Sequence, residues 1–417
     1  NEDDDHESKK ADIARQVVGV WIKTLQTVVM RLPRRWVHVG EREASTTPWL
    51  SEKTTALVKK AEKMRQDAKQ DNASKEEKAA ARSAAASAQK SARREEKDYT
   101  RRSHDRSANS PSQQWKMVNE LSGRKGRRAR EPAATPDEVC KAFKDKVDKV
   151  VNQTQGAPPP HVPRRDPSLT VLSNFRLVSA QDILAALQDS KQSPAEGTDG
   201  LSMQILKRCG TSLHPHLARL ANAVVTLGEW PKEWKEAETI ALWKGKGDPE
   251  KAINYRPVAI LPAVSRLIER VLLGQLQDHL EMSGAIPPQQ HGYRKHHSCQ
   301  TALAHLYDAV ARARVRHHTT LVASFDASGA FDGLAHKWLL EKLNHSAGVR
   351  GSAWQLIHSF LSDRRHRVRL PGARVSEWAD LPTGTPQGGV WSPTLWSIAI
   401  ADMPSCISGG RYASPTT

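Results

Sequence analysis

The main part of the chain begins near Val171, where apolar residues start to recur every three or four positions. This spacing predicts helices over residues 178–190, 198–210, 212–230 and 334–343, and on both sides of the segment 290–299. Alternating apolar and polar residues predict strands at the two ends of 239–261, with a basic loop between them, and at 320–326 and 366–370. Helices mixed with hairpin-like strands indicate an α+β domain, and not a regularly wound parallel sheet.

The chain before this domain is rich in Ala, Lys, Glu, Arg and Ser, and it contains no Gly or Pro from Trp49 to Ser110. We expect a long, mostly solvated helix or a nascent helix there, because the apolar residues at helical spacing form only a short stripe: Leu57, Ala61, Met64 and Ala68. Residues 51–130 carry 22 Lys and Arg against 11 Asp and Glu. This composition fits a solvated linker, and it also fits an arm that contacts RNA or DNA.

The basic cluster GRKGRRAR at 123–130 favours contact with nucleic acid, because clustered cations bind phosphates. The residues expected to make these contacts are Arg124, Lys125, Arg127 and Arg128. A localisation signal is the alternative for the same cluster.

A shorter helix is predicted from Pro136, with Thr135 as its N-cap and Glu138 completing a capping box. Its apolar face, typical of a helix that docks on a neighbour, consists of Val139, Phe143, Val147 and Val150. The Pro-rich segment 156–167 then interrupts regular structure. The predicted organisation is an N-terminal remnant (1–46), a basic helical connector (47–130), a docking helix with a Pro-rich linker (131–170) and the main domain (171–417).

Charge and cysteine content narrow the class of protein. The 63 Lys and Arg exceed the 46 Asp and Glu by 17, which favours a polyanionic partner, with nucleic acid as the first candidate. The cysteines, at 140, 209, 299 and 406, form no CxxC pair and indicate neither a disulfide framework nor a zinc knuckle, so an intracellular location is expected. No apolar run reaches the roughly 18 residues of a membrane span. The start lacks a methionine and a signal peptide, so we expect a piece of a longer protein.

Several local patterns could carry chemistry. Asp326 ends the predicted strand 320–326, where a buried carboxylate needs a metal or a cation; a helix-capping role is the alternative. The Gly-rich segment 384–393 allows close backbone approach beside an amide side chain, as a flat ligand such as a base pair would require. Taken singly, Phe331 fits a core position, and the basic residues of 244–256 fit an ordinary surface. A metal site is not expected among His291, His296, His297, Cys299 and His305, because their spacing fits no common zinc site.

The order of the segments is more specific than any one of them. Six of them follow one another: SPAEGTDGLSMQILKRCG (193–210), LWKGKGDPEKAINYRPVAILPAVSRLIERVL (242–272), QHGYRKHHSCQTAL (290–303), FDASGAFDGLAHKWLLEKL (325–343), SFLSDRRHRVRL (359–370) and GTPQGGVWSPTLWSIAIADM (384–403). In this order they resemble the motifs of the reverse transcriptase domain of non-LTR (LINE-type) retrotransposons, over roughly residues 171–413. The segments TPWLSEKTTALVKKAEKMRQDAK and WKMVNELSGRKG resemble the connector that follows the endonuclease domain of these elements.

The resemblance implies the fingers and a partial palm of a right-hand polymerase, preceded by a basic helical region. It implies an RNA-directed DNA polymerase that uses two Mg²⁺ ions, an RNA template, a DNA primer and dNTPs, acting inside the cell, in nucleus or cytoplasm, as a ribonucleoprotein.

Residue roles follow from the same resemblance. The carboxylate of Asp326 and the carbonyl of Ala327 would bind the metal ions, and Phe331 would be the steric gate that excludes a ribose 2′-hydroxyl, while Asp332 would orient structure. The incoming triphosphate would be held by Arg256, Lys244 and Lys246. The nascent base pair would rest on Gln387 and Gly388, and further contacts to nucleic acid would come from Arg294 and Lys295.

The C-terminal end departs from the family pattern. The second catalytic motif is typically YADD, whereas this chain reads Tyr412, Ala413, Ser414, Pro415. Serine is a poor magnesium ligand beside a carboxylate, and proline cannot donate to the hairpin ladder, so we expect the two-ion site to collapse and activity to be lost. Without the thumb that follows in the family, exposed apolar surface is expected at Trp391, Leu395, Trp396 and Ile398.

Other functions stay open at this point. A non-catalytic RNA- or DNA-binding protein derived from a retroelement would keep the basic segments and ignore Asp326. A maturase-like RNA chaperone is a nearer relative of the polymerase. A structural assembly protein is less favoured, because residues 51–106 lack sustained heptads.

Overall fold

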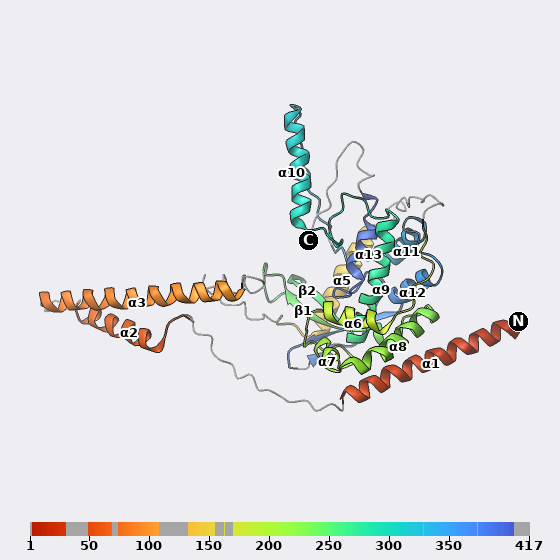
Figure 1. Cartoon of the computed structure of the whole chain (residues 1–417), viewed down its shortest axis with the longest axis horizontal. Coiled ribbons are helices and arrows are strands. Elements are labelled where there is room, and N and C mark those ends of the chain that lie inside the picture. The colour runs from red at the N-terminus through yellow and green to blue at the C-terminus, as the bar shows by residue number, and fades with distance from the viewer. Residues whose placement is uncertain are drawn as a thin grey trace. The chain divides into compact units, whose positions relative to one another are not determined.

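The computed structural model describes residues 2–30, 49–68, 74–107, 132–154, 162, 170–327, 329–372 and 374–403. The chain divides into two compact units, Asn1–Pro33 with Glu131–Thr417, and Arg34–Arg130 (Figure 1).

In the smaller unit, the described residues form two helices that lie side by side, α2 (Glu52–Asp67) and α3 (Lys75–Ser107) (Figure 1). The start of α2 lies against the later half of α3, because the Ser51 hydroxyl and the Thr54 hydroxyl each donate to Glu95 at 2.8 Å. Small buried residues, such as Ala61 and Ala88, line the contact. The prediction of a single long helix was therefore wrong, since the alanines bring two helices together where a continuous helix would leave them in water.

The larger unit is built mainly from helices around one core. These helices are α1 (Glu2–Met30), α6 (Ala180–Asp189), α7 (Met203–Arg208), α8 (His214–Leu227), α9 (Ala263–Met282), α11 (His336–His345), α12 (Gly351–Leu361) and α13 (Ser392–Ala399). α1 runs along α8 and adds Val18 and Ile22 to the core, and its Arg15 pairs with Glu229 at 2.6 Å. A capping box between Ser179 and Asp182 starts α6.

A small mixed sheet stands beside these helices. Its strands are β1 (Glu236–Trp243), β2 (Tyr255–Ile260), β3 (Arg364–Leu370), β4 (Arg374–Val375) and β5 (Ala379–Leu381). β1 pairs with β2 antiparallel and with β3 parallel, and β3 also pairs with β4 and β5. The alternation in β3 buries Val368 and Leu370 on one face, whereas Arg367 and Arg369 on the other face pair with Glu238 at 2.6 and 2.8 Å.

Helix α5 (Pro136–Thr154) covers the apolar face of the sheet, where Val139 and Phe143 pack with Tyr255 and Val368. Its predicted capping box is present, since the Thr135 amide donates to the Glu138 carboxylate at 2.7 Å. The helical periodicity of 136–150 therefore predicted both this helix and its docking face.

The mixed α+β class is confirmed, with more helix than strand in the described residues. The predicted helices of the main domain form, and so do the strands at both ends of 239–261 and at 366–370. Helix α10 (Cys299–Val315) follows the 290–298 loop and projects from the rest of the unit (Figure 1).

Two expectations for the main domain were wrong. Residues 319–327 form no strand, and Leu321 and Phe325 are exposed, because no described segment pairs with their backbone. The expectation of exposed apolar surface near the C-terminal end fails as well: Trp391 and Leu395 are fully buried, since the helices around α13 already close over them.

Candidate functional site

A basic loop, residues 244–254, joins β1 to β2. The Lys244 ammonium donates to the Ile253 carbonyl at 2.7 Å, which ties the two ends of the loop together. Arg256 lies opposite Leu242 in the strand register and is exposed, as is Lys246. Burial lowers the pKa of Lys244, and the neighbouring cations Lys146, Arg256 and Lys246 lower it further, whereas Asp332 opposes the shift. The structure therefore brings the three predicted triphosphate-binding cations together, and Lys244 lies within electrostatic range of Asp332.

The Gln-Gly turn, residues 383–390, is fastened to strand β2. The Ala259 amide donates to the Gln387 carbonyl at 2.7 Å. Gly388 has a φ of 134°, and a Cβ at this position would overlap the Ala259 carbonyl oxygen. Only glycine allows this approach of turn to strand.

Helix α9 holds the other end of the Gln-Gly turn. The buried Glu269 carboxylate accepts the amides of Val390 and Trp391 at 2.7 and 3.3 Å. Burial raises the pKa of Glu269, and the buried Arg364 opposes this shift. The glutamate therefore fixes the point at which the turn enters α13.

A second turn, the Phe-Asp turn (residues 329–334), packs against the first. The amides of Thr385 and Gly384 donate to the carbonyls of Phe331 and Leu334, each at 2.8 Å. Gly384 has a φ of 80°, and a Cβ there would lie 2.5 Å from the Asp332 carbonyl oxygen. The two turns thus form one bonded unit, although about fifty residues separate them in sequence.

Asp332 is the polar centre of this unit. One carboxylate oxygen accepts a hydrogen bond from the Gln387 amide, and the other pairs with the Lys146 ammonium at 3.0 Å. The Asp332 side chain is only 12% exposed. Such a carboxylate needs its partners, because burial of an unpaired charge is costly.

A pocket of about 150 Å³ lies between α5, the sheet and the two turns. Its apolar wall includes Phe143, Val147 and Pro386, and its polar wall includes Asp332 and His366. Most of the surface that lines this pocket is apolar. Lys146 lines it as well and is an electrostatic neighbour of Lys244.

Phe331 points its ring into an aromatic group. Its ring centroid lies 6.3 Å from that of Tyr293 and 6.2 Å from that of Trp396, and the side chain is half-buried. The structure thus sets the predicted gate residue in the same turn as Asp332, next to the Gln-Gly turn.

The predicted metal ligands Asp326 and Ala327 lie in the exposed segment 319–327. Within the described ranges, no three His, Cys, Asp or Glu side chains converge as a metal site. Residues 412–415, the second catalytic motif of the prediction, lie outside the described residues. Among the described residues, Asp326 and Ala327 therefore lie outside any carboxylate cage that could hold magnesium.

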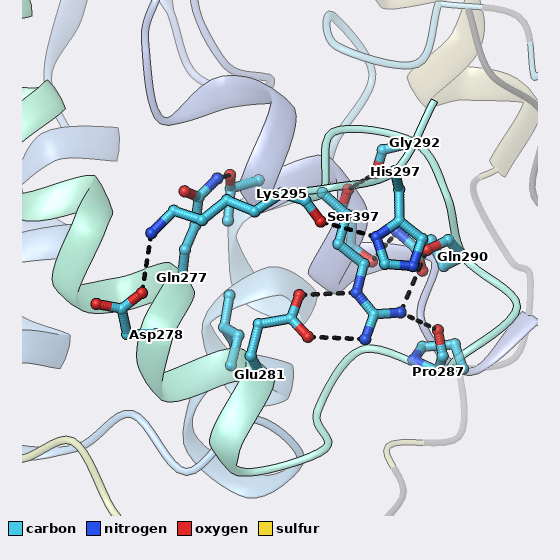
Figure 2. Close-up of polar contacts among 12 residues, drawn as sticks. Gln277, Asp278, Glu281, Pro287, Gln290, Gly292, Lys295, His297 and Ser397 are labelled. Carbon is cyan, nitrogen blue, oxygen red and sulfur yellow. Dashed lines mark hydrogen bonds and ion pairs between the residues drawn. The ribbon is translucent and has the colours of Figure 1, made fainter. Parts of the chain in front are cut away.

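Arg294 and Lys295, predicted to bind nucleic acid, form ion pairs within the protein. Figure 2 shows the pair of Lys295 with Asp278. The guanidinium of Arg294 forms two 2.7 Å hydrogen bonds with Glu281 and also donates to the Pro287 carbonyl at 3.1 Å. Lys295 pairs with Asp278 at 2.9 Å, but its side chain is 47% exposed. Arg294 thus anchors the loop before α10, and Lys295 has the more accessible charge.

Three of the histidines considered at the sequence level come close together. The ring of His291 lies 5.1 Å from that of His297 and 5.7 Å from that of His305. Burial lowers the pKa of His291, and its two neighbours lower it further. The three rings therefore pack as an aromatic cluster.

The cluster of Arg124, Lys125, Arg127 and Arg128 lies outside the described residues. Lys146 is a residue of the site that sequence reasoning missed. A signal for it was present, because Lys146 falls four residues before Val150 and three after Phe143, within the apolar stripe of α5. A lysine inside such a stripe indicates a specific partner.

Residues 245–412 match the reverse transcriptase (RNA-dependent DNA polymerase) family. The chain is 30% identical over 234 residues to the RNA-directed DNA polymerase from the mobile element jockey of Drosophila melanogaster, covering 56% of this chain and 25% of that protein. It is 27% identical over 238 residues to a probable RNA-directed DNA polymerase from transposon BS of the same species, covering 57% of this chain and 26% of that protein. The chain is also 28% identical over 220 residues to a putative 115 kDa protein in the type-1 retrotransposable element R1DM of Drosophila melanogaster, covering 52% of this chain and 20% of that protein.

The chain spans about a quarter of the length of the relatives it matches. No helix in the described part of the chain is long and apolar enough to cross a bilayer.

Proposed function

We propose that this chain, which carries a reverse transcriptase domain related to those of non-LTR retrotransposon polymerases, binds an RNA template paired with a DNA primer and descends from an RNA-directed DNA polymerase. The observation that carries the proposal is the bonded unit of the Phe-Asp turn and the Gln-Gly turn, beside the cations of the 244–254 loop.

The arrangement suits a hybrid duplex for physical reasons. Gln387 and Gly388 offer a small surface with one amide, on which a flat base pair can lie. The charges of Lys244 and Arg256 can neutralise phosphates without reading sequence, because base pairing supplies the sequence choice. Phe331, in the adjoining turn, would then lie next to the sugar of an incoming nucleotide as the steric gate.

We propose that this copy has little or no polymerase activity. Asp326 is the carboxylate expected to bind the ions, and the second motif offers Ser414 and Pro415 in place of two aspartates. Two magnesium ions, when bound, would activate the primer hydroxyl and stabilise the leaving pyrophosphate. One carboxylate and a serine hydroxyl are a weak donor set for such a pair.

Primer extension on an RNA template with Mg²⁺ and dNTPs tests this proposal. We expect salt-dependent binding of the template–primer without extension. Extension that is abolished by Asp326→Asn and retained in Asp363→Asn, whose side chain is 90% exposed, would refute the loss of activity. Failure to bind the hybrid at low salt would overturn the proposal as a whole.

The exposure of Asp326 favours a second candidate, a non-catalytic RNA- or DNA-binding protein acting within an intracellular ribonucleoprotein. Such a protein would bind RNA in a salt-dependent manner, and Asp326→Ala would leave the affinity unchanged.

A further inference from the structure

Helix α5 lies outside the residues that match the reverse transcriptase family, yet it contacts the Phe-Asp turn. A Cβ on Gly333 would lie 2.8 Å from a methyl group of Val150, and one on Gly329 would lie 3.5 Å from the other methyl group. One helical turn earlier, Lys146 pairs with Asp332. The helix therefore touches the turn through both an apolar and a charged contact.

The charged contact continues to the Gln-Gly turn. Asp332 accepts from Lys146 with one oxygen and from the Gln387 side chain with the other. An ionised acceptor makes hydrogen bonds roughly twice as strong as a neutral one, so the carboxylate fixes the Gln387 amide firmly. The backbone carbonyl of Gln387 already accepts the Ala259 amide, which fixes the backbone of the turn. The bond to Asp332 therefore sets the direction of the Gln387 side chain only.

Lys146 is placed to hold the Asp332 carboxylate in the position from which it accepts the Gln387 amide. Of the nearby cations, Lys244 has its ammonium on the Ile253 carbonyl, whereas Lys146 bonds directly to the carboxylate. The Lys146 side chain is 27% exposed and lines the pocket between α5 and the two turns. The Lys146 ammonium therefore pairs with a carboxylate of the protein itself, next to the surface on which the hybrid is proposed to lie.

We propose that Lys146 is a positioning residue for the hybrid duplex, which it affects through Asp332 and the Gln387 side chain. The inference rests on the proposed function, because it takes Gln387 as a contact to the template–primer. Helix α5 is then part of the nucleic-acid site, and its contribution is the orientation of an amide that lies on a different segment of the chain.

A double-mutant cycle on the full chain tests the inference, with a fluorescein-labelled RNA/DNA hybrid that has a recessed primer end as the probe. The variants are Lys146→Met, Gln387→Ala and their combination, and Lys149→Met is the matched control, because Lys149 is an exposed lysine of the same helix. Lys146→Arg keeps the charge and should restore binding. Affinity is measured by fluorescence anisotropy at several salt concentrations.

We expect Lys146→Met to weaken binding about fivefold and Lys149→Met less than twofold. In the Gln387→Ala background, Lys146→Met should weaken binding no more than Lys149→Met does. The slope of affinity against salt should be the same for the two lysine variants, because neither residue is taken to contact a phosphate directly.

Equal affinity of Lys146→Met and Lys149→Met would overturn the inference, and so would an undiminished fivefold loss in the Gln387→Ala background. A smaller salt slope for Lys146→Met alone would show a direct phosphate contact instead. If Lys146→Met does not fold, Lys146→Gln replaces it in the same cycle, since glutamine removes the charge and keeps a polar side chain. Failure of the wild-type chain to bind the hybrid would instead refute the proposed function, so the two failures are distinguishable.

Discussion

Substitution of Gly388 by alanine tests the close approach of the Gln-Gly turn to strand β2. A Cβ at this position would overlap the Ala259 carbonyl oxygen, and the φ of 134° is itself unfavourable for alanine. To relieve the overlap the turn must move away from β2, which breaks the 2.7 Å hydrogen bond from the Ala259 amide to the Gln387 carbonyl. Backbone strain of about 1–3 kcal/mol and a lost hydrogen bond of about 1 kcal/mol give an expected loss of roughly 2–4 kcal/mol in the free energy of unfolding.

Gly372→Ala is the matched control. Gly372 has a φ of 78°, and nothing lies within 4 Å of a Cβ built on it, so only the backbone strain remains, about 1–2 kcal/mol. Urea unfolding followed by tryptophan fluorescence gives the free energies, since Trp230, Trp234 and Trp391 are buried in the core. Hydrogen exchange at the Ala259 amide should accelerate in Gly388→Ala and stay unchanged in the control. Equal stability and equal exchange in the two variants would refute the proposed contact between turn and strand.

Three further predictions concern other parts of the chain. Glu269→Ala removes the acceptor of the Val390 and Trp391 amides and leaves Arg364 buried without its counter-charge. Urea unfolding should therefore show a loss of about 3 kcal/mol in the free energy of unfolding, and a loss below about 1 kcal/mol would contradict this role of Glu269. Burial lowers the pKa of His366 below its usual 6.5, so the contribution of His366 to stability is complete above pH 6.5 and is lost as the pH falls below that value. The Tm of His366→Asn should therefore fall less than that of the wild type between pH 7.5 and 5.5. An equal fall in Tm would argue against this contribution of His366. Glu95→Ala removes the acceptor shared by Ser51 and Thr54, so hydrogen exchange over residues 51–55 should accelerate, while Glu96→Ala, an exposed neighbour, should have no effect.

The sequence predicted those elements whose pattern is local. The capping boxes at Thr135 and Ser179 and the apolar stripe of 136–150 define helices by contacts within a few residues, and both helices form as expected. The β1–β2 hairpin was predicted for the same reason, because its basic loop and flanking strands are contiguous.

The remaining features depend on contacts between distant segments, which periodicity does not encode. The pairing of α2 with α3 comes from small residues that look like a solvated face in sequence. Alternation over 320–326 predicted a strand, but a strand also needs a partner, and none forms among the described residues. At the site, the resemblance carried by the order of motifs implied a contact with the nascent base pair for Gln387 and a structural role for Asp332. The contribution of Lys146 depends on the docking of α5, which the order of motifs does not encode.

Photocrosslinking tests the central claim that the two turns form the surface for the template–primer. A hybrid with 4-thiouracil in the template strand, opposite the primer end, is irradiated with the full chain, and the crosslinked peptides are identified by mass spectrometry. We predict crosslinks within residues 329–334 and 383–390, which are lost when excess unlabelled hybrid competes. Crosslinks confined to residues 51–130 would contradict the account, because they would place the nucleic acid on the basic helical connector and leave the turns without a ligand.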